Sequence, residues 1–92
     1  MIRSFRCKDT LALFEGRHSR KFHNLANVAD KKLAQLHAAE RLSDPALFPG
    51  NRLESLKGDR TGRHSVRMND HYRLVFRWRD GEAYDVEIVD YH

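Results

Sequence analysis

Apolar and polar residues alternate along the second half of the chain, which is the pattern of strands that bury one face. Within residues 72–79, Tyr72, Leu74, Phe76 and Trp78 fall on one side, and Arg73, Val75, Arg77 and Arg79 fall on the other. Residues 84–88 alternate in the same way. Residues 65–68 predict a shorter strand, which Asn69-Asp70 connects to the next by a turn. These three segments predict an antiparallel sheet.

The register of the last two strands follows from the requirement that both apolar rows face the same side. A two-residue Asp80-Gly81 turn would pair Arg77 with Tyr84 and put the two rows on opposite faces. We therefore predict a three-residue loop over residues 80–82. The resulting pairs are Trp78–Tyr84, Phe76–Val86 and Leu74–Ile88, with Arg77 opposite Asp85 on the other face.

The beginning of the chain predicts a strand and a short helix. Residues 1–6 alternate, which favours a short strand. Asp9 and Thr10 are residues that cap helices, and the helix they predict runs to about Glu15. Gly16 follows directly, and glycine commonly ends a helix.

A longer helix is predicted from the three-four spacing of apolar residues that follows. Asn24 or Asn27 would cap it, and it would end near Leu42. Its apolar stripe consists of Leu25, Val28, Ala29, Leu33, Leu36 and Ala39. Residues 45–51 hold both prolines and predict a loop. The order of elements predicts an α+β domain in which a strand and two helices pack on a small, mostly antiparallel sheet.

Length and composition are consistent with one domain over residues 1–92. Cys7 is the single cysteine, so an internal disulfide is excluded and a reducing compartment is favoured. Neither a signal peptide nor an apolar run of the ~18 residues that span a bilayer is recognisable. We therefore expect a cytoplasmic protein.

Charge is distributed unevenly along the chain, whose net charge is +4. Residues 52–79 contain eight cations and three acids, a local net charge of +5, and seven of those cations are arginine. Residues 80–92 contain five acids and no Lys or Arg. Because the arginine fork suits bidentate contact with phosphate, one interpretation is a nucleic-acid interface. The other interpretation, a solvated basic face, is equally compatible with composition.

Four segments of the chain are distinctive, namely Met1–Phe5, Leu53–Arg60 (Leu-Glu-Ser-Leu-Lys-Gly-Asp-Arg), Tyr72–Phe76 and the final Asp90-Tyr91-His92. Together they resemble the HigB branch of the RelE/ParE toxin superfamily. The resemblance spans the whole chain. It implies a RelE-like fold and a bacterial toxin that enters the ribosomal A site and cuts mRNA. It also implies a helix-turn-helix antitoxin of HigA type as partner, through which alone the toxin would reach operator DNA.

The resemblance also implies a set of catalytic residues. These are Lys57, Arg73, Asp90, Tyr91 and His92, and Glu54 is a further candidate at the one position where the chain departs from the pattern. Some HigB proteins carry a histidine where this chain has Glu54, which leaves either Glu54 or His92 as the general base. The basic stretch adds candidates for RNA contact, namely Arg60, Arg63, His64, Arg67 and Arg77.

These residue types suit RNA cleavage without a metal or other cofactor. Such cleavage needs a base for the 2′-OH, donors for the charged phosphorane and an acid for the leaving 5′ oxygen. His92 carries an imidazole, the side chain whose ordinary pKa lies near neutral, and Tyr91 can donate a hydrogen bond or stack on a base. The plainer interpretation of Asp90-Tyr91-His92 is a polar strand end. Metal binding is disfavoured, because there is no cysteine pair and no histidine pair at zinc-helix spacing.

Two other functional classes stay open. A gyrase poison of the ParE kind would share the fold, but it would not need an acid/base group such as Asp90-Tyr91-His92. A non-catalytic module that binds RNA or the ribosome would need only the basic stretch.

Overall fold

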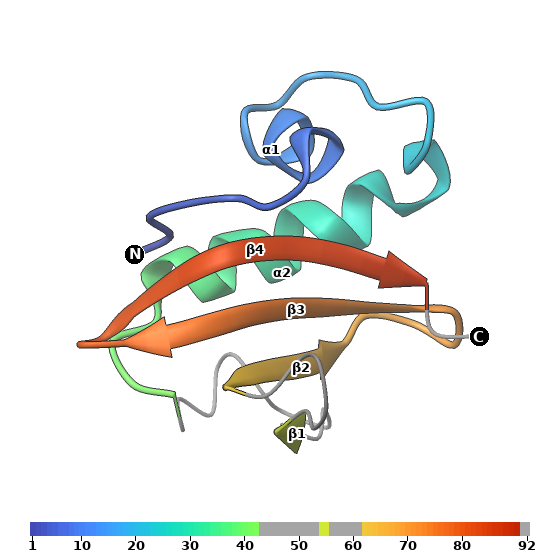
Figure 1. Ribbon diagram of the computed structural model, residues 1–92. Helices are drawn as coiled ribbons and strands as arrows, with labels where there is room; N and C mark the ends of the chain where they lie inside the picture. The colour runs from blue at the N-terminus through green and yellow to red at the C-terminus, as the bar shows by residue number, and fades with distance from the viewer. Residues whose placement is uncertain (43–53, 56–61, 91–92) are drawn as a thin grey trace.

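Helices pack against one face of a four-stranded sheet in the computed structural model, which describes residues 1–42, 54–55 (backbone only) and 62–90 (Figure 1). Its elements are α1 (Lys8–Phe14), the 3-10 helix η1 (His23–Leu25), α2 (Ala26–Ala38), β1 (Glu54–Ser55), β2 (Arg63–Arg67), β3 (Tyr72–Arg79) and β4 (Glu82–Asp90). The strand order is β1-β2-β3-β4, and each neighbouring pair is antiparallel. The predicted α+β class is confirmed, whereas the loop predicted over residues 45–51 lies outside the described residues.

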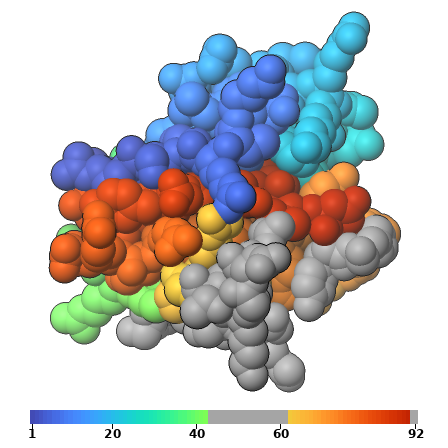
Figure 2. Space-filling view, viewed as in Figure 1, coloured from blue at the N-terminus to red at the C-terminus, as the bar shows by residue number. Residues whose placement is uncertain are grey.

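The predicted N-terminal strand is an extended segment that runs parallel to β4. Isolated bridges join Ile2 to Ala83 and Phe5 to Val86. Four backbone hydrogen bonds of 2.8–3.1 Å hold residues 1–6 along β4, and Figure 2 shows this dark blue segment lying against the red strand. Ile2 and Phe5 both contact the core, so strict alternation is broken and a regular strand does not form.

The short helix begins one residue before the predicted cap. Its N-cap is Cys7, which makes no side-chain capping bond, and Asp9 lies within the first turn. Thr10 is instead fully buried, and its Oγ1 accepts a hydrogen bond of 3.1 Å from the Ile88 N–H. This bond ties α1 to β4. Gly16 ends the helix as predicted, with a left-handed φ of +78°.

The longer helix, α2, is shorter than its apolar pattern suggested. Leu25 is its N-cap and makes no side-chain capping bond, so neither predicted asparagine cap forms. The helix ends at Ala38 because Ala39 is extended, with ψ of 133°. Ala39 is nevertheless buried, so the apolar pattern continues past the last helical residue. Val28 was predicted in the buried stripe but is 36% exposed.

The turn between β3 and β4 contains two residues, not three. Asp80 and Gly81 both have positive φ, 53° and 79°. Positive φ at both central residues defines a type I′ turn, whose twist matches that of the flanking strands. The pairs next to it are Arg79–Glu82, Trp78–Ala83 and Arg77–Tyr84, so the predicted loop over residues 80–82 and the Trp78–Tyr84 pair are wrong.

A β-bulge then changes the register by one residue. The irregularity lies between Val75 and Arg77 on β3, and beyond it Leu74 pairs with Ile88 as predicted. On β4 the bulge coincides with Asp85, whose φ is +52°. The extra residue turns the apolar row of β4 toward the helices. The predicted three-residue loop would have given these side chains the same orientation.

The core lies between the helices and the apolar face of the sheet. Its largest fully buried apolar side chains are Phe22, Leu33 and Leu36 from the helical layer, and Val66, Leu74, Phe76 and Val86 from the sheet. Among the described residues, no helix combines the length and hydropathy needed to cross a membrane.

The Thr10–Ile88 bond yields a stability prediction. Thr10→Val would leave the Ile88 N–H buried without a partner, so we expect the free energy of unfolding to fall by about 1–3 kcal/mol. Thr10→Ser keeps the hydroxyl and loses one methyl group, which should lower it by only about 1 kcal/mol. Urea unfolding of both variants makes the comparison. Equal losses would attribute the effect to methyl packing instead.

Candidate functional site

Five arginines from β2 and β3 lie on the side of the sheet opposite the helices. We call this side the arginine face, and its residues on these two strands are Arg63, Ser65, Arg67, Arg73, Val75, Arg77 and Arg79. Arg63 lies directly opposite Arg77, and Arg67 lies directly opposite Arg73. Like charges directly opposite one another destabilise a sheet, so this face needs anionic partners.

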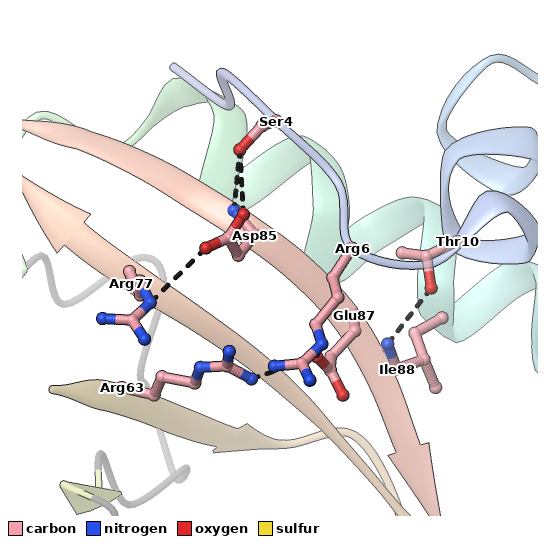
Figure 3. A network of polar contacts seen from close by, with 8 residues as sticks. All are labelled: Ser4, Arg6, Thr10, Arg63, Arg77, Asp85, Glu87 and Ile88. Atoms are coloured by element: carbon pink, nitrogen blue, oxygen red, sulfur yellow. Dashed lines mark hydrogen bonds and ion pairs between the residues drawn. The ribbon is translucent and has the colours of Figure 1, made fainter. Parts of the chain in front are cut away.

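Glu87 on β4 is one such partner (Figure 3). It lies opposite Val75 on the arginine face, and its Oε2 is 3.3 Å from Arg63 Nη1 and 3.3 Å from Arg6 Nε. The Arg63 side chain is only 7% exposed, whereas that of Arg6 is 55% exposed. Since a buried guanidinium cannot be neutralised, Glu87 supplies the charge that makes the burial of Arg63 tolerable.

Arg73 is held in place by Ser65 on β2. Its Nε donates a hydrogen bond of 3.0 Å to Ser65 Oγ, and both residues are buried. The backbone of Ser65 also pairs with that of Glu54 on β1. Arg73 lies on the face opposite Leu74, as its place in the alternation predicts, but it is packed into the structure and does not extend into solvent.

Arg77 is paired with the residue at the bulge. Its Nε is 3.4 Å from Asp85 Oδ2, although Tyr84 and not Asp85 lies directly opposite Arg77, so the predicted cross-strand pair of Arg77 with Asp85 is wrong while their side chains do form an ion pair. The Asp85 N–H donates a hydrogen bond of 2.9 Å to Ser4 Oγ (Figure 3). The N-terminal segment therefore supports the left-handed residue, which in turn positions one arginine of the face.

Arg67 and His64 occupy different surroundings. Arg67 is exposed, forms an ion pair with Asp70 and donates to the Asn69 carbonyl. His64 lies opposite Phe76 on the helix side, with the ring centroids 6.1 Å apart, and so does not share a face with Arg63. Burial lowers the pKa of His64 below its ordinary value.

The predicted catalytic residues are only partly described. Asp90 is the exposed last residue of β4, opposite Tyr72. It therefore belongs to the helix side of the sheet, while Arg73 pairs with Val89. Lys57, Arg60, Tyr91 and His92 lie outside the described residues.

Arg6, Ser65 and Glu87 are not among the site residues that the sequence predicted. Two of them belong to the arginine face by register, because Ser65 pairs with Val75 and Val75 pairs with Glu87. The predicted register, with Arg77 opposite Asp85, already implied Glu87 opposite Val75, but alternation does not show which arginine a carboxylate contacts. Arg6 follows an irregular extended segment, and no pattern in the sequence relates it to β4.

The fold and the arginine face define the class as a small α+β domain with one basic sheet surface. A family model described as "RelE-like toxin of type II toxin-antitoxin system HigB" matches residues 3–92. The chain belongs to this HigB-like toxin family, as its resemblance to HigB proteins predicted.

Individual relatives are similar in sequence to the chain over shorter stretches. The chain is 45% identical over 60 residues to Toxin HigB-1 of Vibrio cholerae, a match covering 65% of this chain and 63% of that protein. It is 39% identical over 41 residues to Endoribonuclease HigB of Proteus vulgaris, covering 45% of each. An uncharacterized protein of Haemophilus influenzae is 34% identical over 66 residues, covering 72% of this chain and 65% of that protein. Each match therefore spans less than two thirds of the relative's length.

The position of Glu87 between two arginines predicts unequal effects of two substitutions. Glu87→Gln leaves Arg63 buried without a carboxylate, so we expect the free energy of unfolding to fall by roughly 3 kcal/mol. Arg6→Ala removes the exposed partner of the same oxygen and should change it by less than about 1 kcal/mol. Chemical denaturation measures both. Similar small losses would mean that Glu87 does not stabilise buried Arg63.

The buried imidazole of His64 predicts a pH dependence of stability. Because its pKa is lower in the folded state, the unfolded chain takes up the proton first as the pH falls. The contribution to stability is therefore present above about pH 6.5 and is lost as the pH falls below it. His64→Leu should remove this part of the slope in urea unfolding between neutral and mildly acidic pH. His18→Leu, at an exposed position, should retain it.

Proposed function

We propose that this chain is the toxin of a type II toxin–antitoxin pair and a ribosome-dependent endoribonuclease. It would cut mRNA in the ribosomal A site in the cytoplasm and so inhibit translation, with an antitoxin of HigA type as its partner. Membership of the HigB-like toxin family supports the class. The arginine face supports the kind of substrate.

The facing arginine pairs carry this proposal. Arg63–Arg77 and Arg67–Arg73 place four cations on two adjacent strands. Asp85 and Glu87 offset part of this charge, because they pair with Arg77 and Arg63. A phosphate backbone is a polyanion with bidentate acceptor geometry, and it would offset the repulsion further when bound.

The proposed chemistry is an attack by the neighbouring hydroxyl. Glu54 or His92 would take the proton of the 2′-OH, and the 2′ oxygen would then attack the adjacent phosphorus. Arg73 and Lys57 would hold the charged phosphorane, with Tyr91 as a further donor. The bond to the 5′ oxygen would break as an acid of the Asp90-Tyr91-His92 group protonates it. The products would carry a 2′,3′-cyclic phosphate and a 5′ hydroxyl, and this route needs no metal.

A guanidinium held in one position suits stabilisation of the charged phosphorane. Arg73 is oriented by Ser65 before any substrate arrives, and preorganised charge stabilises a transition state without reorganisation. The basic surface is small, so affinity for free RNA should be weak and salt-dependent. The ribosome would then supply the missing positioning of the substrate.

The proposal predicts that cleavage depends on translation. Purified protein should cut mRNA in a ribosome complex and leave the same mRNA almost intact without ribosomes. Mapping of the ends should find 5′ hydroxyls and 2′,3′-cyclic phosphates. Efficient cutting of free RNA would contradict the ribosome dependence. Blocked translation with intact mRNA would instead indicate a non-catalytic inhibitor, and DNA breaks that require gyrase would indicate a poison of the ParE kind.

Arg73→Ala should lower the cleavage rate by ~10²–10³, the usual effect of losing one preorganised contact to a phosphorane. Ser65→Ala keeps the Arg73 guanidinium and removes the hydroxyl that accepts a hydrogen bond from its Nε. The cleavage rate of this variant should therefore fall by less than that of Arg73→Ala. Thermal melting must show both variants folded at the assay temperature. If Arg73→Ala is unfolded there, Arg73 has a structural role, and Arg73→Lys then tests whether charge without the fork suffices.

A further inference from the structure

A pocket lies at the turn end of the β3–β4 hairpin, beside Arg77. Its volume is about 310 Å³, and it is lined by Gly62, Arg77, Trp78, Arg79, Tyr84 and Asp85. We infer that this pocket binds one nucleotide of single-stranded RNA next to the cleaved one, with its base on Tyr84 and its phosphate at Arg77. The inference rests on the proposed function and adds to it a second contact with the substrate.

The ring of Tyr84 is already arranged for stacking. Arg77 and Tyr84 are directly opposed across the hairpin, which puts the ring on the arginine face. The Arg79 guanidinium carbon lies 5.0 Å from the ring centroid, in a cation–π contact that fixes the ring beside the pocket. Aromatic rings and arginines combined in this way bind single strands, because every base presents a π-face.

The charge and rigidity of the pocket favour a phosphate. Two guanidiniums and one carboxylate line it, so an excess positive charge remains. Arg77 does not have to be ordered by the ligand, because Asp85 already pairs with it and Ser4 supports Asp85. A held arginine loses less conformational entropy on binding than a free one.

Gly62 keeps one wall of the pocket without a side chain. Its φ is +88°, a conformation that strains other residues, and a Cβ there would lie 3.5 Å from Arg77 Nη1. Arg77 lies four positions after Arg73 on β3, which is about 13 Å along a strand. The pocket therefore suits a neighbour of the reacting nucleotide and not that nucleotide itself.

An acidic segment of a protein partner is the competing occupant. Carboxylates would engage Arg77 and Arg79, but they would leave the ring of Tyr84 unused. The pocket volume lies at the small end of the usual range for ligand sites, about 300–1,000 Å³, as expected for one nucleotide. RNA therefore uses more of the lining than an acidic peptide does.

A direct test uses fluorescence anisotropy, because the indole of Trp78, the single tryptophan of the chain, belongs to the helix side of the sheet and packs against the core. The full chain is titrated at low salt into a 5′-labelled single-stranded RNA oligonucleotide whose 2′ positions are methylated to prevent cleavage. We expect a saturable rise in anisotropy. Tyr84→Ala should weaken binding by about 5- to 100-fold, the range for loss of one stacked base, and Tyr84→Phe should bind like the wild type.

Exposed cations provide the charge-matched comparison. Arg79→Ala should weaken binding, whereas Arg20→Ala, at an exposed position in the connector before α2, should not. Because Arg79 is exposed, this pair tests the pocket even if Tyr84→Ala fails to fold. Equal affinity of Arg79→Ala and Arg20→Ala, or an unchanged anisotropy with RNA, would overturn the inference. An anisotropy response to a labelled acidic peptide but not to RNA would likewise overturn it.

The titration uses no ribosome, so its outcome is separable from that of the proposed function. Cleavage of mRNA on the ribosome without an anisotropy response of the oligonucleotide would refute the pocket and leave the nuclease in place. An oligonucleotide signal that depends on Tyr84, without cleavage, would retain the RNA pocket and refute the nuclease.

Discussion

The tight Asp80-Gly81 turn and the bulge at Asp85 together determine which side chains of β4 face the helices. The turn alone would set a register in which Val86 lies opposite Val75, on the arginine face. In the structure Val86 is fully buried in the core and Leu74 pairs with Ile88. Because of the extra residue in the bulge, the hairpin can keep the favoured two-residue turn and still bury Val86 in the core. The unusual φ of Asp85 is compensated by its bonds to Ser4 and Arg77.

The positions of the acidic side chains on the arginine face depend on the same bulge. Beyond the bulge, Glu87 falls on that face, where it contacts buried Arg63 and exposed Arg6. At the bulge itself, Asp85 meets Arg77. These two carboxylates, together with Asp70, which pairs with Arg67, neutralise part of the charge of the four facing arginines and hold cations in fixed positions. Preorganised positive charge of this kind is what phosphate binding and phosphorane stabilisation both require.

Sequence patterns predicted the layers of the fold but not its irregular points. Alternation in β3 and β4 identified the sheet and its buried face, because a half-buried strand enforces a period of two. The bulge was missed because a longer loop would have satisfied the same burial pattern. The end of α2 was misplaced because Ala39 stays buried after the helix has ended. The partnership of Arg6 and Glu87 joins residues 81 positions apart, and no local pattern encodes it.

The central claim is that RNA lies on the arginine face and not on the helical layer. A photocrosslinking amino acid placed at position 67 or at position 28 tests this in a ribosome–mRNA complex. Position 67 lies opposite Arg73 and its side chain is 55% exposed, and position 28 is 36% exposed on α2. If RNA lies on the arginine face, mRNA should crosslink to position 67 and not to position 28. A crosslink from position 28 alone would contradict it.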